Sequence, residues 1–161
     1  MKKLWVILVF SLLLCGCSAE ETFETVEDVY MEEQWGPKSI EVAIPLNAKK
    51  TQLTSGEGSL YFCDGYELTT EIMAAGNLSE TFGELTGFPL DSLTMVETMQ
   101  TDMARYECVW TAAGEGGDNV GRAVVLDDGN YHYCVTVMAQ SSKAYDLQQT
   151  WKDLLGSIQL V

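Results

Sequence analysis

Basic residues are scarce in this sequence. It has 9 lysines and arginines against 24 aspartates and glutamates, which gives a formal net charge of −15. Phosphate backbones are bound by basic surfaces, so this balance argues against a nucleic-acid partner. It also disfavours binding to anionic lipid headgroups. There is 1 histidine, there are 3 prolines, and no CxxC pair or internal repeat occurs, so the sequence lacks the signatures of zinc-finger and repeat proteins. With 47% hydrophobic residues, the 161 residues have the composition of one globular domain.

Long apolar runs are also missing, apart from a short one at the N-terminus. Lys2 and Lys3 precede the almost wholly apolar run 4–14, which is about half the roughly 20 residues that a membrane-spanning helix needs. A basic start, a short apolar run and small residues are typical of a secretory signal peptide. The following Leu14-Cys15-Gly16-Cys17 resembles the lipobox of bacterial lipoproteins. This resemblance implies a signal peptide over residues 1–16 and lipid attachment at Cys17, where a diacylglyceryl group would anchor the protein in the cell membrane, facing outside the cytoplasm.

The rest of the chain divides at about residue 39. Segment 17–38 is predicted to be an acidic tether, because it holds seven acidic residues and Lys38 as its only base. Its aromatic residues suggest that part of it packs on the domain. Segment 39–161 is predicted to be a single α+β domain. Cleavage before Cys17 would remove the charges of Lys2 and Lys3 and take the net charge from −15 to −17.

Alternation with a period of two begins at Ser39. Ile40, Val42 and Ile44 alternate with less apolar residues up to Pro45 and predict a strand. Asp64-Gly65 predicts a hairpin turn between two apolar runs within 59–73. Further strands are expected over 93–101, 105–112, 120–126 and 131–139. The last two of these are apolar on both faces, which is typical of central strands that are covered on both sides.

Two helices can supply these covers. Asn77, followed by Glu80, predicts a helix start, and Gly87 predicts its end. A second helix near the C-terminus is predicted from an apolar stripe at helical spacing, formed by Leu147, Trp151, Leu154 and Leu155. The predicted fold is therefore α+β, a single antiparallel meander sheet with helices packed on both faces. This layout, with the aromatic strand at 131–137 and the tryptophan-bearing terminal helix, resembles the PsbP-like family. The resemblance implies a sandwich fold and a binding or assembly role, and it carries no active-site residues.

Three cysteines follow Cys17: Cys63, Cys108 and Cys134. The predicted compartment permits disulfides, but each cysteine lies in an apolar run where a thiol behaves as a small hydrophobe. In a meander the strands of Cys108 and Cys134 are separated by a whole strand and lie about 9.6 Å apart, too far for a disulfide. A bond from Cys63 to either of the others stays open.

Candidate chemistry is weak in this sequence. Glu115, Asp118, Asp127 and Asp128 are candidate calcium ligands, although EF-hand spacing is absent. His132 is the histidine that any thiol- or metal-dependent hydrolase site would use, together with Cys108 or the acidic loop.

We therefore expect a non-enzymatic binding or scaffolding module without a cofactor. Its expected partners are the membrane, through the N-terminal lipid, and an extracytoplasmic protein or small ligand. A small cell-surface hydrolase is the alternative. A packed His132 favours the binding module, and an open cleft around it favours the enzyme.

The lipobox leads to a first prediction. Replacing Cys17 with alanine removes the thiol that accepts the lipid, so the variant should accumulate as unprocessed or unlipidated protein. Mass spectrometry and membrane fractionation of the wild type and the variant test this. An unchanged mass together with unchanged membrane retention would contradict lipid attachment at Cys17.

Overall fold

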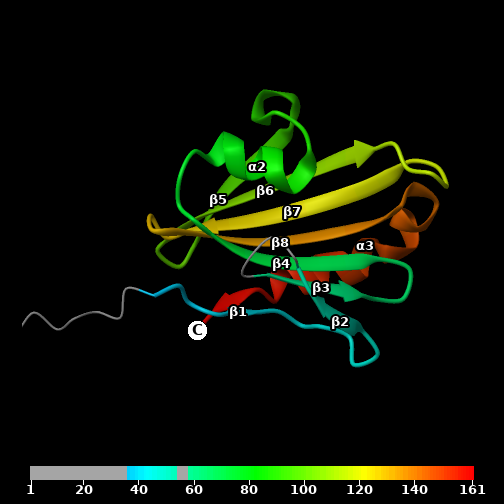
Figure 1. Cartoon of the computed structure of the whole chain (residues 1–161), viewed down its shortest axis with the longest axis horizontal. Coiled ribbons are helices and arrows are strands. Elements are labelled where there is room, and N and C mark those ends of the chain that lie inside the picture. Colours follow the sequence, from blue (N-terminus) through cyan, green and yellow to red (C-terminus); the bar gives the residue numbers. More distant parts are fainter. Residues whose placement is uncertain (1–35, 54–57) are drawn as a thin grey trace, which may run out of the picture. The chain divides into compact units, whose positions relative to one another are not determined.

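The computed structural model describes residues 36–53 and 58–161 (Figure 1). The predicted signal peptide, Cys17 and the acidic segment up to residue 35 lie outside the described residues. Gly36–Val161 forms one compact unit. Its elements, in chain order, are β1 (Ile40–Glu41), β2 (Lys49–Gln52), β3 (Gly58–Phe62), β4 (Glu67–Ala74), α2 (Leu78–Thr86), the 3₁₀ turn η1 (Leu90–Ser92), β5 (Thr94–Gln100), β6 (Met103–Ala112), β7 (Asn119–Asp127), β8 (Tyr131–Gln140), α3 (Ser141–Gly156) and β9 (Gln159–Leu160). No helix in the described part of the chain is long and apolar enough to cross a membrane.

Seven of these strands form one antiparallel sheet in the order β2-β3-β4-β8-β7-β6-β5. The hairpin β3–β4 and the run β5–β6–β7–β8 confirm the predicted antiparallel pairs. The prediction of a pure meander is wrong, however. After β4 the chain crosses the sheet through α2 and η1 to the far edge, and β5 to β8 then run back so that β8 pairs with β4.

A single sheet is also wrong, because β1 and β9 form a second, two-stranded sheet in which Ile40 faces Leu160. The predicted strand over Ile40–Ile44 is regular only at its first two residues, although Val42 and Ile44 still pack on the core. Strand β2 was not predicted, because its sequence Lys-Lys-Thr-Gln is exposed throughout and shows no alternation of apolar and polar residues.

The local signals at the ends of elements act as expected. The side chain of Asn77 accepts a hydrogen bond from the Ser79 amide at 3.0 Å and caps α2. Gly87 ends α2 with φ 78°, and its amide donates to the Gly83 carbonyl. Gly65 takes φ 82° in the β3–β4 turn, a conformation that glycine adopts without a steric cost.

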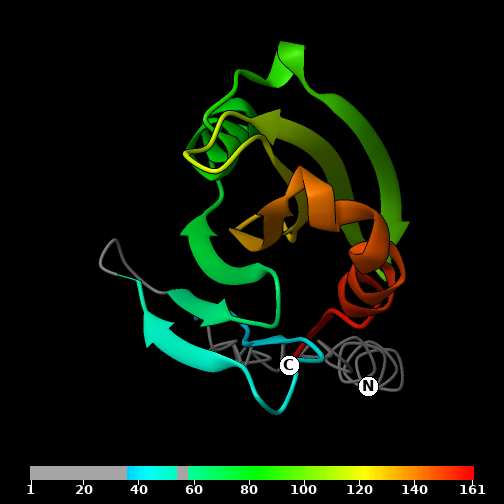
Figure 2. The ribbon, with the colours of Figure 1, turned by 90° about the vertical axis from the view of Figure 1, so that its right-hand side faces the viewer.

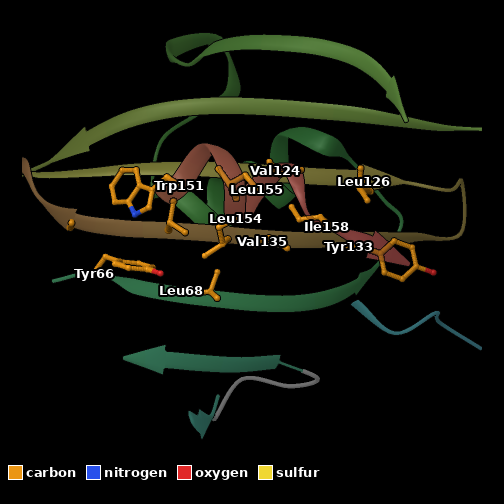
Figure 3. Close-up of a cluster of buried hydrophobic side chains, with 12 residues drawn as sticks. Tyr66, Leu68, Val124, Leu126, Tyr133, Val135, Trp151, Leu154, Leu155 and Ile158 are labelled. Carbon is orange, nitrogen blue, oxygen red and sulfur yellow. The ribbon is translucent and has the colours of Figure 1, made fainter. Parts of the chain in front are cut away.

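Alternate residues of β7 enter two different apolar clusters. Val124 and Leu126 pack with Trp151, Leu154 and other residues of the cluster around α3 (Figure 3). Ala123 and Val125 pack with Phe82 of α2 in the other cluster. Successive residues of a strand point to opposite faces, so the two clusters lie on opposite faces of the sheet. Below, these are called the α3 face and the α2 face.

One close contact on the α2 face depends on a glycine. Trp110 on β6 is directly opposite Gly121 on β7. A Cβ atom on Gly121 would clash with the Trp110 indole. The absence of a side chain at position 121 therefore lets the indole lie across β7 inside the core.

The three described cysteines are free thiols. Cys108 and Cys134 are 3% and 1% exposed and lie in the α2-face cluster, on strands that β7 separates. Cys63 is half-buried and packs against the α3-face cluster. The structure therefore answers the question left open for Cys63, since no bond joins it to either of the others.

The burial of Trp151 generates a stability prediction. Its side chain is 2% exposed and meets Tyr66 edge to face, with ring centroids 6.4 Å apart. Trp151→Ala should lower the free energy of unfolding by about 3–5 kcal/mol, measured by urea unfolding. Trp151→Phe should cost less, because it keeps most of the ring contacts and removes an indole N–H that has no partner among the described residues. A loss below about 1 kcal/mol for the alanine variant would be the effect of a surface position and would contradict this packing.

The thiols generate a separate prediction, testable by alkylation of an unlipidated chain that lacks residues 1–17. In the native protein Cys63 should react with iodoacetamide, while the buried Cys108 and Cys134 should react only after unfolding. Intact mass without reductant should then show three modified thiols. A single modified thiol after unfolding would establish a disulfide and contradict either the strand order or the burial of these thiols.

Candidate functional site

His132 is packed inside the α2 face. Its side chain is 1% exposed, and its Nδ1 lies 2.7 Å from the hydroxyl of Thr81, which is itself buried on α2. Its Nε2 lies 3.6 Å from Asp127 Oδ2. Hydroxyl, imidazole and carboxylate form a chain of the kind that hydrolases use, but here both the hydroxyl and the ring are enclosed. The Thr81–His132 contact joins α2 to β8 and satisfies two buried polar groups.

Cys108 does not complete a thiol–imidazole pair with this histidine. Strand pairing places Cys108 opposite Ala123, which is opposite Thr136 of β8. Cys108 is therefore two strands away from β8, which is about 9.6 Å across the sheet. Its level on β8 is that of Thr136, four residues and about 13 Å along the strand from His132.

The chemistry of the buried thiols points the same way. Burial raises the pKa of Cys108 to about 11 and, with the nearby carboxylates of Glu71 and Glu84 contributing, that of Cys134 to about 12. The thiolate is the nucleophilic form of cysteine, so both groups are unreactive near neutral pH.

The four candidate calcium ligands lie at opposite ends of one strand. Glu115 and Asp118 belong to the loop before β7, whereas Asp127 and Asp128 lie at its other end, eight residues and about 27 Å further on. The described part of the chain contains no group of three His, Cys, Asp or Glu side chains placed to hold a metal ion. The structure thus does not bring the four acids together.

Asp128 has a structural use instead. Its Oδ1 accepts hydrogen bonds from the amides of Asn130 and Tyr131, and its Oδ2 accepts one from the Tyr133 hydroxyl at 2.9 Å. Burial alone would raise the pKa of this carboxyl, but these three donors and the nearby Lys38 lower it below its ordinary value. The Tyr133 hydroxyl also accepts from the Lys38 amide, so this network ties the start of the domain to the β7–β8 turn.

A different set of residues lines an open groove of about 930 Å³ between α3 and the strands β6 and β7. Arg105, Glu107 and Arg122 come from the sheet, and Tyr145, Gln149 and Lys152 are among the residues that come from α3. We call this hollow the α3 groove. Sequence reasoning missed it. The signal in the sequence was the scarcity of basic residues. Two of the nine are Lys2 and Lys3, so only seven follow Cys17, and three of these seven line the groove.

The two arginines of the α3 groove differ in what they contact. Arg105 is 12% exposed and donates to Glu107 at 2.7 Å, to Gln100 at 2.6 Å and to the Leu155 carbonyl at 3.0 Å. Arg122 is 29% exposed, and within the described residues its one ion pair is the long 3.8 Å contact with Glu107. Arg105 thus fastens the C-terminal end of α3 to the sheet, whereas the guanidinium of Arg122 keeps donors available to another molecule.

Comparison with known proteins gives a structural likeness only. No protein-family model matches the chain, and no curated protein matches its sequence. Among solved structures, cyanobacterial PsbP from Synechocystis sp. PCC 6803 is similar with a TM-score of 0.56 and 8% identity, covering 78% of this chain and 95% of that one.

Two further structures are similar. The Ran-binding protein Mog1p of Saccharomyces cerevisiae has a TM-score of 0.50 and 12% identity, covering 76% of this chain and 90% of that one. A Bacteroides thetaiotaomicron protein has a TM-score of 0.51 and 11% identity, covering 79% of this chain and 49% of that one. Likeness at such low identity concerns the fold alone. This chain therefore has a PsbP-like fold, as its sequence layout predicted.

Proposed function

We propose that this protein is a lipid-anchored extracytoplasmic binding module that recognises another molecule through the α3 groove and catalyses no reaction. One observation carries the proposal: the residues with catalytic potential are enclosed in the core, while a basic side chain with available donors lies in an open groove. His132 and Cys108 are 1% and 3% exposed, whereas Arg122 is 29% exposed.

The fold supports this proposal without naming a ligand. The two apolar clusters on opposite faces of the sheet, one containing α2 residues and the other α3 residues, support the sandwich that the PsbP-like resemblance implies. Mog1p, which shares the fold, is a Ran-binding protein, so the fold is compatible with protein recognition. The lipobox-like Leu14–Cys17 segment supports anchoring outside the cytoplasm, where such a module would meet its partner.

The groove can be tested in intact cells by photo-crosslinking. A photoreactive benzoylphenylalanine at Gln149, which lines the α3 groove, should give a discrete adduct. The same probe at Glu80, exposed on α2, should not give that adduct. Arg122→Glu should reduce the amount of adduct, while Lys49→Glu, a charge reversal on the exposed strand β2, should leave it unchanged. Adduct formation from Glu80 alone, or equal yields with and without Arg122, would contradict this assignment.

A further inference from the structure

The α3 face of the sheet is covered over its middle but not over its β5–β6 flank. Strand pairing puts Val109 of β6 directly beside Arg122 of β7, and Val96 of β5 directly beside Glu107 of β6. Val96 and Val109 are 57% and 52% exposed although they lie on a sheet face rather than in a loop. In Figure 2 the strand β5 runs along the outer edge of the sheet, and only its C-terminal end comes close to α3 and the segment after it, where Gln100 donates to the Ile158 carbonyl. We call Val96, Val109 and the groove-lining Arg122 the open flank.

The open flank combines apolar and basic groups at short range. Directly opposed residues on neighbouring antiparallel strands have Cβ atoms about 5 Å apart, so the Val109 side chain lies next to the aliphatic part of the Arg122 side chain. Lys152 adds a second positive charge from the α3 wall of the groove, and Tyr145, 82% exposed, adds an aromatic ring there. A ligand bound across the open flank would therefore contact an apolar surface and a positively charged hydrogen-bond donor on neighbouring residues.

We propose that the open flank binds an extended polypeptide segment of a partner protein, with a carboxylate on Arg122 and an apolar side chain against Val96 and Val109. This inference rests on the proposed binding function and names the class of its ligand. A guanidinium binds a carboxylate through two parallel hydrogen bonds. The groove is open and lined by residues of both charges, which suits alternating side chains of a peptide better than a compact multiply charged anion, because Glu107 and Asp146 also line it.

The acidity of the rest of the chain makes this recognition selective. With a net charge of −15, most of the surface repels an acidic segment, and the α3 groove concentrates three of the basic residues that follow Cys17. Repulsion elsewhere and attraction at one place together favour a single docking position. The same net charge opposes pairing between two copies of this chain.

The probe is a synthetic heptapeptide of alternating glutamate and valine, blocked at both ends. It is added to the ¹⁵N-labelled mature chain carrying Cys17→Ser, in 0.15 M salt, where the Debye length of about 8 Å screens distant acidic residues. Amide shift changes should map to β5, β6 and α3. Arg122→Gln should weaken binding by about tenfold or more, because a charge-assisted, two-bond contact is lost. Arg122→Lys should give an intermediate loss, because it keeps only the charge.

Two matched controls make the outcome specific. Lys49→Gln should leave the affinity unchanged, and a peptide with glutamine in place of glutamate should bind no better than the Arg122→Gln variant binds the acidic peptide. Glu107→Gln should tighten binding several-fold, because it removes a negative charge beside Arg122. A gain of affinity cannot come from a variant that fails to fold, so this arm stays informative even if another variant is unstable.

Several results would overturn the inference. These are shift changes confined to other elements, unchanged affinity in Arg122→Gln, or weaker binding in Glu107→Gln. Shift changes at the open flank with inorganic phosphate or with vesicles of phosphatidylglycerol, but not with the peptide, would assign the flank to a phosphate group instead. Concentration-dependent association of the chain with itself would assign it to a second copy. Failure of the peptide while the Gln149 adduct still forms in cells would reject this ligand class and leave the proposed binding function standing.

Discussion

The double-sided burial of β7 and β8 is the constraint from which the rest of the structure follows. Val124, Val125, Val135 and Val137 are all completely buried, although alternate residues point to opposite faces of the sheet. Such strands need apolar cover on both sides. Helix α3 follows β8 directly and packs on one face, so the other face must be covered by a helix from elsewhere in the chain. The crossing from β4 through α2 to the far edge of the sheet supplies that helix and places β8 between β4 and β7.

Local signals in the sequence were enough to predict most elements, whereas long-range pairing was not. Asn77, Gly87 and Asp64-Gly65 act through neighbouring backbone groups, so their effect is visible in a short window of sequence. The β4–β8 pairing joins residues about 65 positions apart and depends on where α2 folds back, which no local pattern encodes. Strand β2 is held by its pairing with β3 and has no buried side chain to give it an apolar period. The two strands that are apolar on both faces and the fold-level resemblance both pointed to helices on the sheet, but neither gave a register.

The same constraint explains why the predicted chemistry was misplaced. His132 and Cys134 of the central strand β8 become interior groups, so His132 finds a hydroxyl partner on α2, and Cys134 becomes a packing residue with a raised pKa. Cys108, on the α2 face of β6, is likewise a packing residue with a raised pKa. Aspartates at the β7–β8 turn accept hydrogen bonds from backbone amides of the turn itself; Asp127, for example, accepts one from the Gly129 amide. Residue type alone therefore indicated reactive groups, while strand position determined that they are structural. Arg122 was overlooked for the opposite reason, because a lone arginine in an apolar strand carries no motif.

The open flank exists because the sheet is wider than the single helix that covers this face. Neighbouring strands are about 4.8 Å apart, so a seven-stranded sheet is about 29 Å wide, whereas a helix with its side chains covers only about 10–12 Å. On the α3 face, α3 packs over the centre, and Ile40, Val42, Ile44 and Leu160, from the β1–β9 sheet and the chain that follows β1, pack beside it. Towards β5, the described residues provide no such second layer, and Val96 and Val109 stay exposed. Arg105 ties the C-terminal end of α3 to β6 through its hydrogen bond to the Leu155 carbonyl, next to the groove that Arg122 lines. A single helix on a wide sheet thus creates both a stable core and an apolar, cation-bordered surface that another chain can cover.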